Sequence, residues 1–250
     1  MRFTTVLPLA ALLLALPARA AVYDEFEVHG TDLDPPGQWS VDQHLNYGLR
    51  GRRKGEFPDA LPPNRGVSAT TEIARGLTPW WETALYLPMA MEAGGRFHAG
   101  GAKLRNLFVL AGRGEATSFG LLTEFRALSN RFMPSSFGWE IRPIVSHTAG
   151  RWTAVATLGF LGGFTWRNPT VLAPALRLDY RLAPDWTLGA EHYADLGPVE
   201  RPERLEHQAH QSFAVVEHEW RGATLVLGLG RGLTPASDRW VAKLRVGVGF

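Results

Sequence analysis

The sequence contains no cysteine among its 250 residues. This absence excludes disulfides, zinc–thiolate sites, iron–sulfur clusters and cysteine nucleophiles, and it fits an exported protein. After residue 20, no apolar run reaches the ~18 residues that a membrane-spanning helix needs. Although there are 27 glycines, no phosphate-binding glycine loop follows a buried strand. We therefore expect no cofactor.

The excess of positive charge is also small, since 26 lysines and arginines against 24 acidic residues give a formal net charge of +2. Arg2 and Arg19 lie in an N-terminal segment that is expected to be removed, which leaves the rest of the chain neutral. The longest basic run is Arg52-Arg53-Lys54. We therefore predict no nucleic-acid partner.

Residues 1–20 have the pattern of a secretory signal peptide. Arg2 precedes an apolar run over 6–16, and Ala18 and Ala20 occupy the two positions that a signal peptidase reads. The run is too short to cross about 30 Å of hydrocarbon as a helix, which disfavours an N-terminal membrane anchor. The mature chain is predicted to begin at Ala21.

Residues 38–250 alternate apolar with polar or small residues in segments of similar length, separated by turn residues. A period of two predicts β-strands, and an even number of them suits a closed up-and-down barrel. The twelve expected strands are 39–49, 67–73, 81–89, 104–110, 119–125, 137–145, 152–160, 172–182, 186–192, 211–220, 223–229 and 240–250.

Aromatic residues gather near the ends of these segments, as in the two girdles of a membrane barrel. A soluble β-sandwich would instead place most of them mid-strand, in its core. The aromatic residues are Trp39, Trp80, Trp81, Phe137, Trp152, Trp186, Trp220, Trp240 and Phe250. The opposite strand faces carry charges that would line a polar lumen. These are Glu72, Glu82, Lys103, Arg105, Glu124, Arg126, Glu140, Arg142, Arg177, Asp179, Glu191, Lys243 and Arg245.

The connections alternate between long and short along the chain. Outer-membrane barrels combine long outer loops with short periplasmic turns, so the alternation supports the strand count. The fold class predicted is an all-β, transmembrane, antiparallel up-and-down barrel located in the outer membrane, with outer-membrane lipid and lipopolysaccharide around it.

The last strand places Trp240, Leu244, Val246, Val248 and Phe250 on one face, and the chain ends on Phe250. This ending resembles the C-terminal assembly signal of bacterial outer-membrane barrels. The resemblance implies the barrel-assembly machinery as a partner during insertion, because an edge strand is a template for strand addition.

Three short motifs carry a second resemblance. They are Gly76-Leu-Thr-Pro79 with the Trp-Trp-Glu that follows, Lys103-Leu-Arg-Asn106, and Trp240-Val-Ala-Lys243. In these, the region from Gly76 to Phe250 resembles porin-like or transport barrels grouped with proteins of aromatic (phenol meta-pathway) degradation. The resemblance implies the fold and the compartment, and hydrophobic or aromatic compounds among the solutes.

The acidic segment over 21–37 shows no strand pattern. It can fold into the lumen as a plug against the arginines, or hang as a loose periplasmic arm. We expect the arm, because short terminal segments are commonly untethered.

Neither a metal site nor a catalytic residue is predicted. The spacing of Glu203, Glu206, His207 and His210, with His192 and His218 nearby, matches no defined ligand set. Ser146 and His147 are adjacent and would point to opposite faces of a strand. His210 and Ser212 share a face but have no orienting acid beside them.

The function predicted is passive or facilitated passage of small solutes through the lumen. The first alternative is a non-conducting structural or surface-interaction barrel that uses its long loops 51–65 and 194–208. A barrel lipid hydrolase ranks third, and we expect the protein not to be an enzyme.

Overall fold

The computed structural model describes residues 25–164 and 169–250, so the predicted signal peptide lies outside the described residues. Among the described residues, no helix is long and apolar enough to cross a membrane. The strands are β1 (Trp39–Arg50), β2 (Val67–Thr78), β3 (Trp81–Met91), β4 (Phe97–Ala99), β5 (Gly101–Ala111), β6 (Thr117–Leu128), β7 (Phe137–Ala149), β8 (Trp152–Gly163), β9 (Val171–Ala183), β10 (Trp186–Asp195), β11 (Ala209–Trp220), β12 (Ala223–Gly232) and β13 (Trp240–Gly249).

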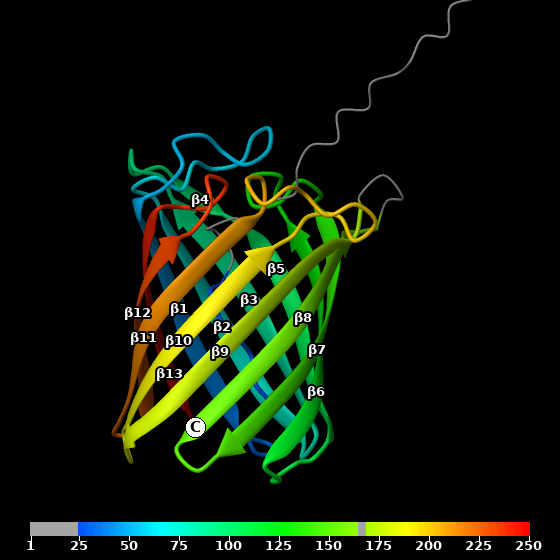
Figure 1. The fold of residues 1–250 in the computed structure, drawn as a ribbon, viewed down its shortest axis with the longest axis vertical. Helices are drawn as coiled ribbons and strands as arrows, with labels where there is room; N and C mark the ends of the chain where they lie inside the picture. The colour runs from blue at the N-terminus through cyan, green and yellow to red at the C-terminus, as the bar shows by residue number, and fades with distance from the viewer. Residues whose placement is uncertain (1–24, 165–168) are drawn as a thin grey trace, which may run out of the picture.

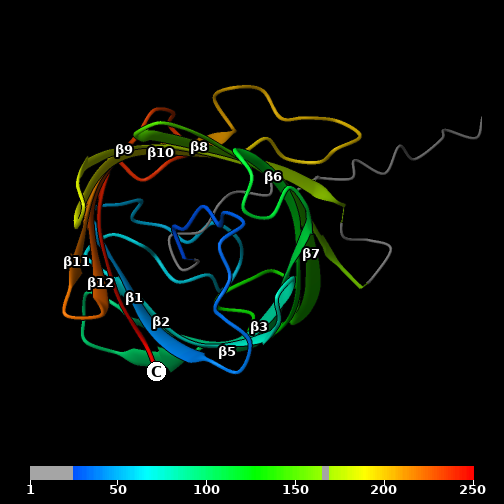
Figure 2. The ribbon, with the colours of Figure 1, turned by 90° about the horizontal axis from the view of Figure 1, so that it is seen from below.

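The strands form one closed antiparallel barrel (Figures 1 and 2). Each long strand pairs with its neighbours in sequence, and β1 pairs with β13 to complete the circle. Apart from β4, these are the twelve strands that the alternation predicted. Closure gives each of the twelve long strands a hydrogen-bonded partner on both edges, which a barrel needs in order to satisfy its backbone in lipid.

The predicted loop before the fourth long strand contains an additional short strand, β4. It pairs with the end of β3 over Met89–Met91. Gly100 lies between β4 and β5, and Gly101, the first residue of β5, has a φ of +121°. A Cβ on Gly101 would lie 2.2 Å from the carbonyl oxygen of Ala127. β4 and β5 therefore follow one edge of β3 with a break that requires glycine.

Many of the outward-facing side chains along the strands are large, apolar and exposed. Examples are Leu104 at 47%, Phe125 at 52% and Leu176 at 53% exposed. A soluble protein would bury such a surface, whereas a membrane barrel presents it to lipid. The long loops gather at one end of the barrel, and the short turns and the C-terminus at the other (Figure 1).

The aromatic girdle is uneven between the two ends. Trp39, Trp81, Trp152 and Trp186 each begin a strand that rises from the turn end, whereas Trp240 begins a strand at the loop end. Most tryptophans thus mark the interface at the turn end, which is the periplasmic one in barrels of this kind.

The terminal phenylalanine closes the barrel at the turn end. The backbone N–H of Phe250 donates to Trp39 at 2.8 Å, and that of Trp39 donates back at 3.0 Å. The Phe250 side chain is 72% exposed. The ring therefore lies on the surface at the turn end of the barrel.

We predict that Phe250→Ala reduces the amount of barrel in the outer membrane several-fold, because the aromatic end of the insertion strand is lost. The measurement is the heat-modifiable band in the outer-membrane fraction. Phe97→Ala, at a 62% exposed phenylalanine of the loop end, is the control. Equal yields for the two variants would contradict the assembly signal.

Candidate functional site: the barrel lumen

The charged residues predicted to line the lumen lie on inward strand faces, where they form ion pairs. Carboxylates and cations alternate around the wall, as the buried Arg105, Glu124 and Lys243 illustrate. Charges withdrawn from water need partners of opposite sign, so this pairing is what permits so many of them inside.

Arg105 on β5 is the centre of one ion-pair group. Its Nη2 lies 2.6 Å from Oε1 of Glu72 and 2.8 Å from Oε1 of Glu82, and the side chain is only 3% exposed. The other oxygen of Glu72 lies 3.1 Å from Nε2 of His44. One guanidinium therefore joins β2, β3 and β5 at the lumen wall.

A second group extends the pairing to β7. Glu124 lies 3.5 Å from Lys103 and 3.9 Å from Arg126. Glu140 lies 3.8 Å from Arg126 and 2.6 Å from Arg142.

A third group covers the opposite wall. Arg177 contacts Asp179 at 2.7 Å, Glu217 at 2.9 Å and Glu191 at 3.9 Å. Lys243 pairs with Glu191 as well. Together the three groups surround the lumen with fixed charges of both signs.

The N-terminal segment, residues 25–37, lies inside the barrel (the thin blue coil within the ring of Figure 2). Glu25 pairs with Lys103, and Glu27 pairs with Arg245 at 2.5 Å. Lys243 donates to the carbonyl oxygen of Phe26 at 2.9 Å. The expected loose arm is therefore not observed, because the lumen cations supply partners for the acidic segment.

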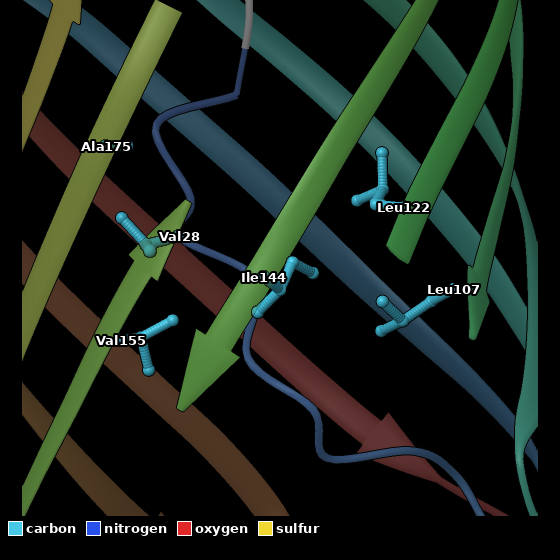
Figure 3. Packing of buried hydrophobic residues seen from close by; sticks show 6 residues of the cluster. All are labelled: Val28, Leu107, Leu122, Ile144, Val155 and Ala175. Carbon is cyan, nitrogen blue, oxygen red and sulfur yellow. The ribbon is translucent and has the colours of Figure 1, made fainter. Parts of the chain in front are cut away.

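Apolar packing also holds this segment. Val28 lies in an interior cluster with Leu107, Leu122, Ile144, Val155 and Ala175 (Figure 3). The ring of Phe26 lies 4.8 Å from that of Phe213 and 5.3 Å from that of Tyr193. The alternation pattern did not predict this interior apolar cluster, although its wall residues are apolar positions on the otherwise polar faces of five consecutive long strands, β5 to β9.

A cavity of about 570 Å³ lies between the N-terminal segment and the turn end. Its lining includes Gln38, Arg151 and Thr224, which sit at or beside that end of the strands. Its charged residues are eight carboxylates, of Glu27, Asp32, Asp34, Asp42, Glu72, Glu82, Asp179 and Glu217, and five guanidinium groups, of Arg105, Arg151, Arg177, Arg181 and Arg245. The chamber is thus polar, with an excess of negative charge.

One group of lumen residues has the chemistry of a metal site. Ligand atoms of Glu27, His44 and Glu72 all lie within 4.8 Å of one another. Arg105 and Arg245 already contact the other oxygens of Glu72 and Glu27, so the carboxylates are neutralised without an ion.

The loop histidines considered from the sequence do not converge. His207 faces Glu206 at 3.5 Å, and His218 lies 3.8 Å from Asp185. His210 contacts His192 instead. Ser146 is buried inside the barrel, whereas the neighbouring His147 is exposed.

At the loop end, residues 51–66 are tied to two other loops. Leu61 packs with Ala90, Leu128 and Phe132. The backbone N–H of Arg52 donates to Oδ1 of Asp238 at 2.7 Å. These contacts fix the longest outer loop against its neighbours.

Glu56 lies within this loop and is buried beside Arg52, whose Nη2 is 3.5 Å away. Burial raises the pKa of Glu56 to about 8, against the opposing charge of Arg52. In the opened loop the carboxyl would ionise near its usual pKa of 4.5. The closed loop therefore holds a proton that the opened loop releases, so closure weakens as pH rises between these values.

We predict that Glu56→Gln removes this pH dependence, since glutamine keeps the size of the side chain without the titrating proton. Wild-type protein should be cut by protease within 51–66 faster at pH 9 than at pH 5, and the variant equally at both. Glu200→Gln, on another outer loop, is the control. A variant that retains the wild-type ratio would contradict the role of Glu56.

No protein-family model matches the chain, and the search of curated proteins finds no match. Solved structures do match. An outer membrane channel from Pseudomonas putida F1 has a TM-score of 0.59 at 10% identity, over 90% of this chain and 100% of that one. The KdgM porin has a TM-score of 0.57 at 10% identity, over 84% and 98%. LpxR from Salmonella typhimurium has a TM-score of 0.50 at 8% identity, over 84% and 99%. The chain therefore has the closed-barrel fold of outer-membrane channels and porins.

Proposed function

We propose that this protein is an outer-membrane channel for small hydrophilic solutes, whose lumen the N-terminal segment narrows. The observation that carries the proposal is the position of residues 25–37 inside a charged lumen, above a polar cavity of about 570 Å³. A barrel that served only as a support would need neither the cavity nor a polar segment that narrows its lumen.

The contacts of the segment support a reversible constriction. They combine ion pairs, such as Glu27 with Arg245, with a modest apolar anchor at Val28. Each lumen cation that binds the segment also has a wall carboxylate nearby, as Arg245 has Asp42 at 3.7 Å. The wall would therefore remain charge-paired when the segment moves.

The charge of the cavity supports a preference for cations. Carboxylates outnumber arginines in its lining, and fixed charges at a constriction select mobile ions of the opposite sign. The polar lining also favours hydrophilic solutes over the hydrophobic or aromatic compounds that the motif resemblance implies.

The test is single-channel recording of the refolded mature chain in a planar bilayer, with salt gradients to measure the reversal potential. We expect small, discrete, cation-selective steps. Glu27→Gln should enlarge them because the bond to Arg245 weakens, and Glu206→Gln, at an exposed loop position, should not. A heat-modifiable barrel without conductance, in both the wild type and Glu27→Gln, would favour the non-conducting alternative.

A further inference from the structure

The outer wall of the barrel carries a second polar group, at the level of the outer leaflet and separate from the lumen. Ser212 of β11 and His192 of β10 are direct cross-strand partners, and both face outward. Ser212 lies three residues, or about 10 Å, along β11 from its loop end. Polar side chains, even half-buried ones such as these two, are unusual on a lipid-facing wall and need an explanation.

These residues form a hydrogen-bonded chain. Oγ of Ser212 lies 2.8 Å from Nδ1 of His192. Nε2 of His192 lies 3.2 Å from Nδ1 of His210, whose Nε2 lies 2.9 Å from Oε1 of Gln208. Gln208 is oriented in turn, because its Nε2 donates to the carbonyl oxygen of Glu203 at 2.7 Å.

With neutral imidazoles, only one proton arrangement satisfies every contact. Oε1 of Gln208 can only accept, so Nε2 of His210 carries a proton and its Nδ1 accepts from Nε2 of His192. Nδ1 of His192 is then unprotonated and accepts the hydroxyl proton of Ser212. The chain thus holds His192 in the tautomer that a general base for a serine nucleophile requires. His210 therefore takes the position that a carboxylate has in a serine–histidine–acid triad.

A largely apolar groove leads to the serine. A cavity of about 520 Å³ crosses the outside of β7, β8, β9 and β10 and ends at His192 and Ser212. Its outward apolar lining is Val145, Ala154, Ala156, Leu176, Leu178 and Ala190, and His147 of β7 is the polar side chain at the far end. The small alanine side chains form the bottom of the groove and the larger leucine side chains form its sides. A groove of this shape suits an extended acyl chain from the surrounding membrane.

A cation flanks the serine on the other side. Arg231 of β12 is the cross-strand partner of Ser212 and is exposed on the outer wall. Its guanidinium lies over the ring of Trp240 at 5.4 Å, which holds it at the interface. Arginine is well suited to bind a phosphate. Three features therefore lie side by side across the outer wall: the anion-binding Arg231, the Ser212 hydroxyl with its base His192, and the apolar groove.

We propose that Ser212, with His192 as base and His210 as a positioning residue, cleaves acyl esters of phosphate-bearing lipids at the outer wall. The Ser212 oxygen attacks the ester carbonyl carbon while His192 takes the hydroxyl proton. The bond to the alcohol oxygen breaks, and His192 returns the proton to that alcohol. Water, activated by the same base, then releases the fatty acid and restores the serine.

The direct test uses a long-chain alkyl fluorophosphonate on the refolded protein, followed by peptide mass spectrometry. Wild type should be labelled at Ser212, and Ser212→Ala should not be labelled. His192→Ala should slow labelling about 100-fold or more. Thr71→Val, which removes an outward hydroxyl from β2 outside the groove, is the matched control and should label normally.

Hydrolysis is measured as fatty acid released from phosphatidylethanolamine micelles and, separately, from lipid A, so that the two arms identify the source of the ester. His210→Leu should lower kcat about ten-fold at unchanged KM, and His210→Asn should restore most of it, because the asparagine oxygen replaces Nδ1 as acceptor. Arg231→Gln should raise KM for both phosphate-bearing lipids.

Folded wild-type protein that neither labels at Ser212 nor releases fatty acid from either lipid would overturn the proposal. So would labelling that persists in Ser212→Ala or proceeds at the wild-type rate in His192→Ala. None of these measurements involves conductance. The proposed channel and the proposed outer-wall site are therefore tested independently of each other.

Discussion

Val28→Asp is expected to increase the single-channel conductance of the barrel several-fold. Val28 is only 4% exposed and packs among Leu107, Leu122, Ile144 and Val155. A carboxylate placed there would lack a partner, and burying an unpaired charge costs several kcal/mol at the least. Departure of the segment from the lumen avoids this cost, because its backbone and acids can then meet water.

The measurement is planar-bilayer recording of the variant beside a deletion of residues 25–33. Both should show the same enlarged conductance if Val28 anchors the constriction. Val199→Asp makes the same chemical change at a 41% exposed loop position and should leave the conductance unchanged. If Val28→Asp and the deletion both behave as wild type, residues 25–33 do not limit passage.

Arg105→Met is expected to destabilise the barrel by about 3–5 kcal/mol, the cost of removing one partner from a buried ion pair. Glu72 and Glu82 share this guanidinium, and both are buried. Without it, two carboxylates face the same small volume. The lost free energy should appear in urea titrations of the barrel refolded into lipid vesicles.

The matched variants separate charge from packing. Arg151→Met removes an exposed arginine and should cost less than about 1 kcal/mol. The triple change Arg105→Met, Glu72→Gln and Glu82→Gln removes the charges together and should recover most of the loss. A single Arg105→Met variant as stable as wild type would mean that water or the N-terminal segment replaces the guanidinium.

The strands could be predicted from the sequence because alternate residues of each strand face opposite environments. Residues that face the lipid must be apolar, and residues that face the lumen are charged or polar. Trp81, Leu85 and Leu87 face out on β3, whereas Glu82 and Tyr86 face in. Each strand repeats this requirement, so a single-sequence period of two determines both the strand count and the inward set. The short strand β4 and the break at Gly100 that follows it were not predicted, because three residues are too few to show a period.

The position of residues 25–37 could not be obtained in this way. An acidic segment without periodicity is compatible with either an arm or a plug, and its placement depends on Lys103, Lys243 and Arg245, which closure brings together from distant strands. The hydrogen-bonded Ser212, His192 and His210 on the outer wall could not be predicted as a group for the same reason. His210 and Ser212 alone lack an orienting group, and His192 joins them only through the register of β10 with β11.

The sequence by itself thus determined the strands, their inward and outward faces and the closed barrel, because these follow from local alternation and turn spacing. Only the tertiary structure decided what fills the lumen and which polar side chains meet. Those contacts join residues separated by up to 218 positions, as Glu27 and Arg245 are, and no local pattern encodes a distance of that kind.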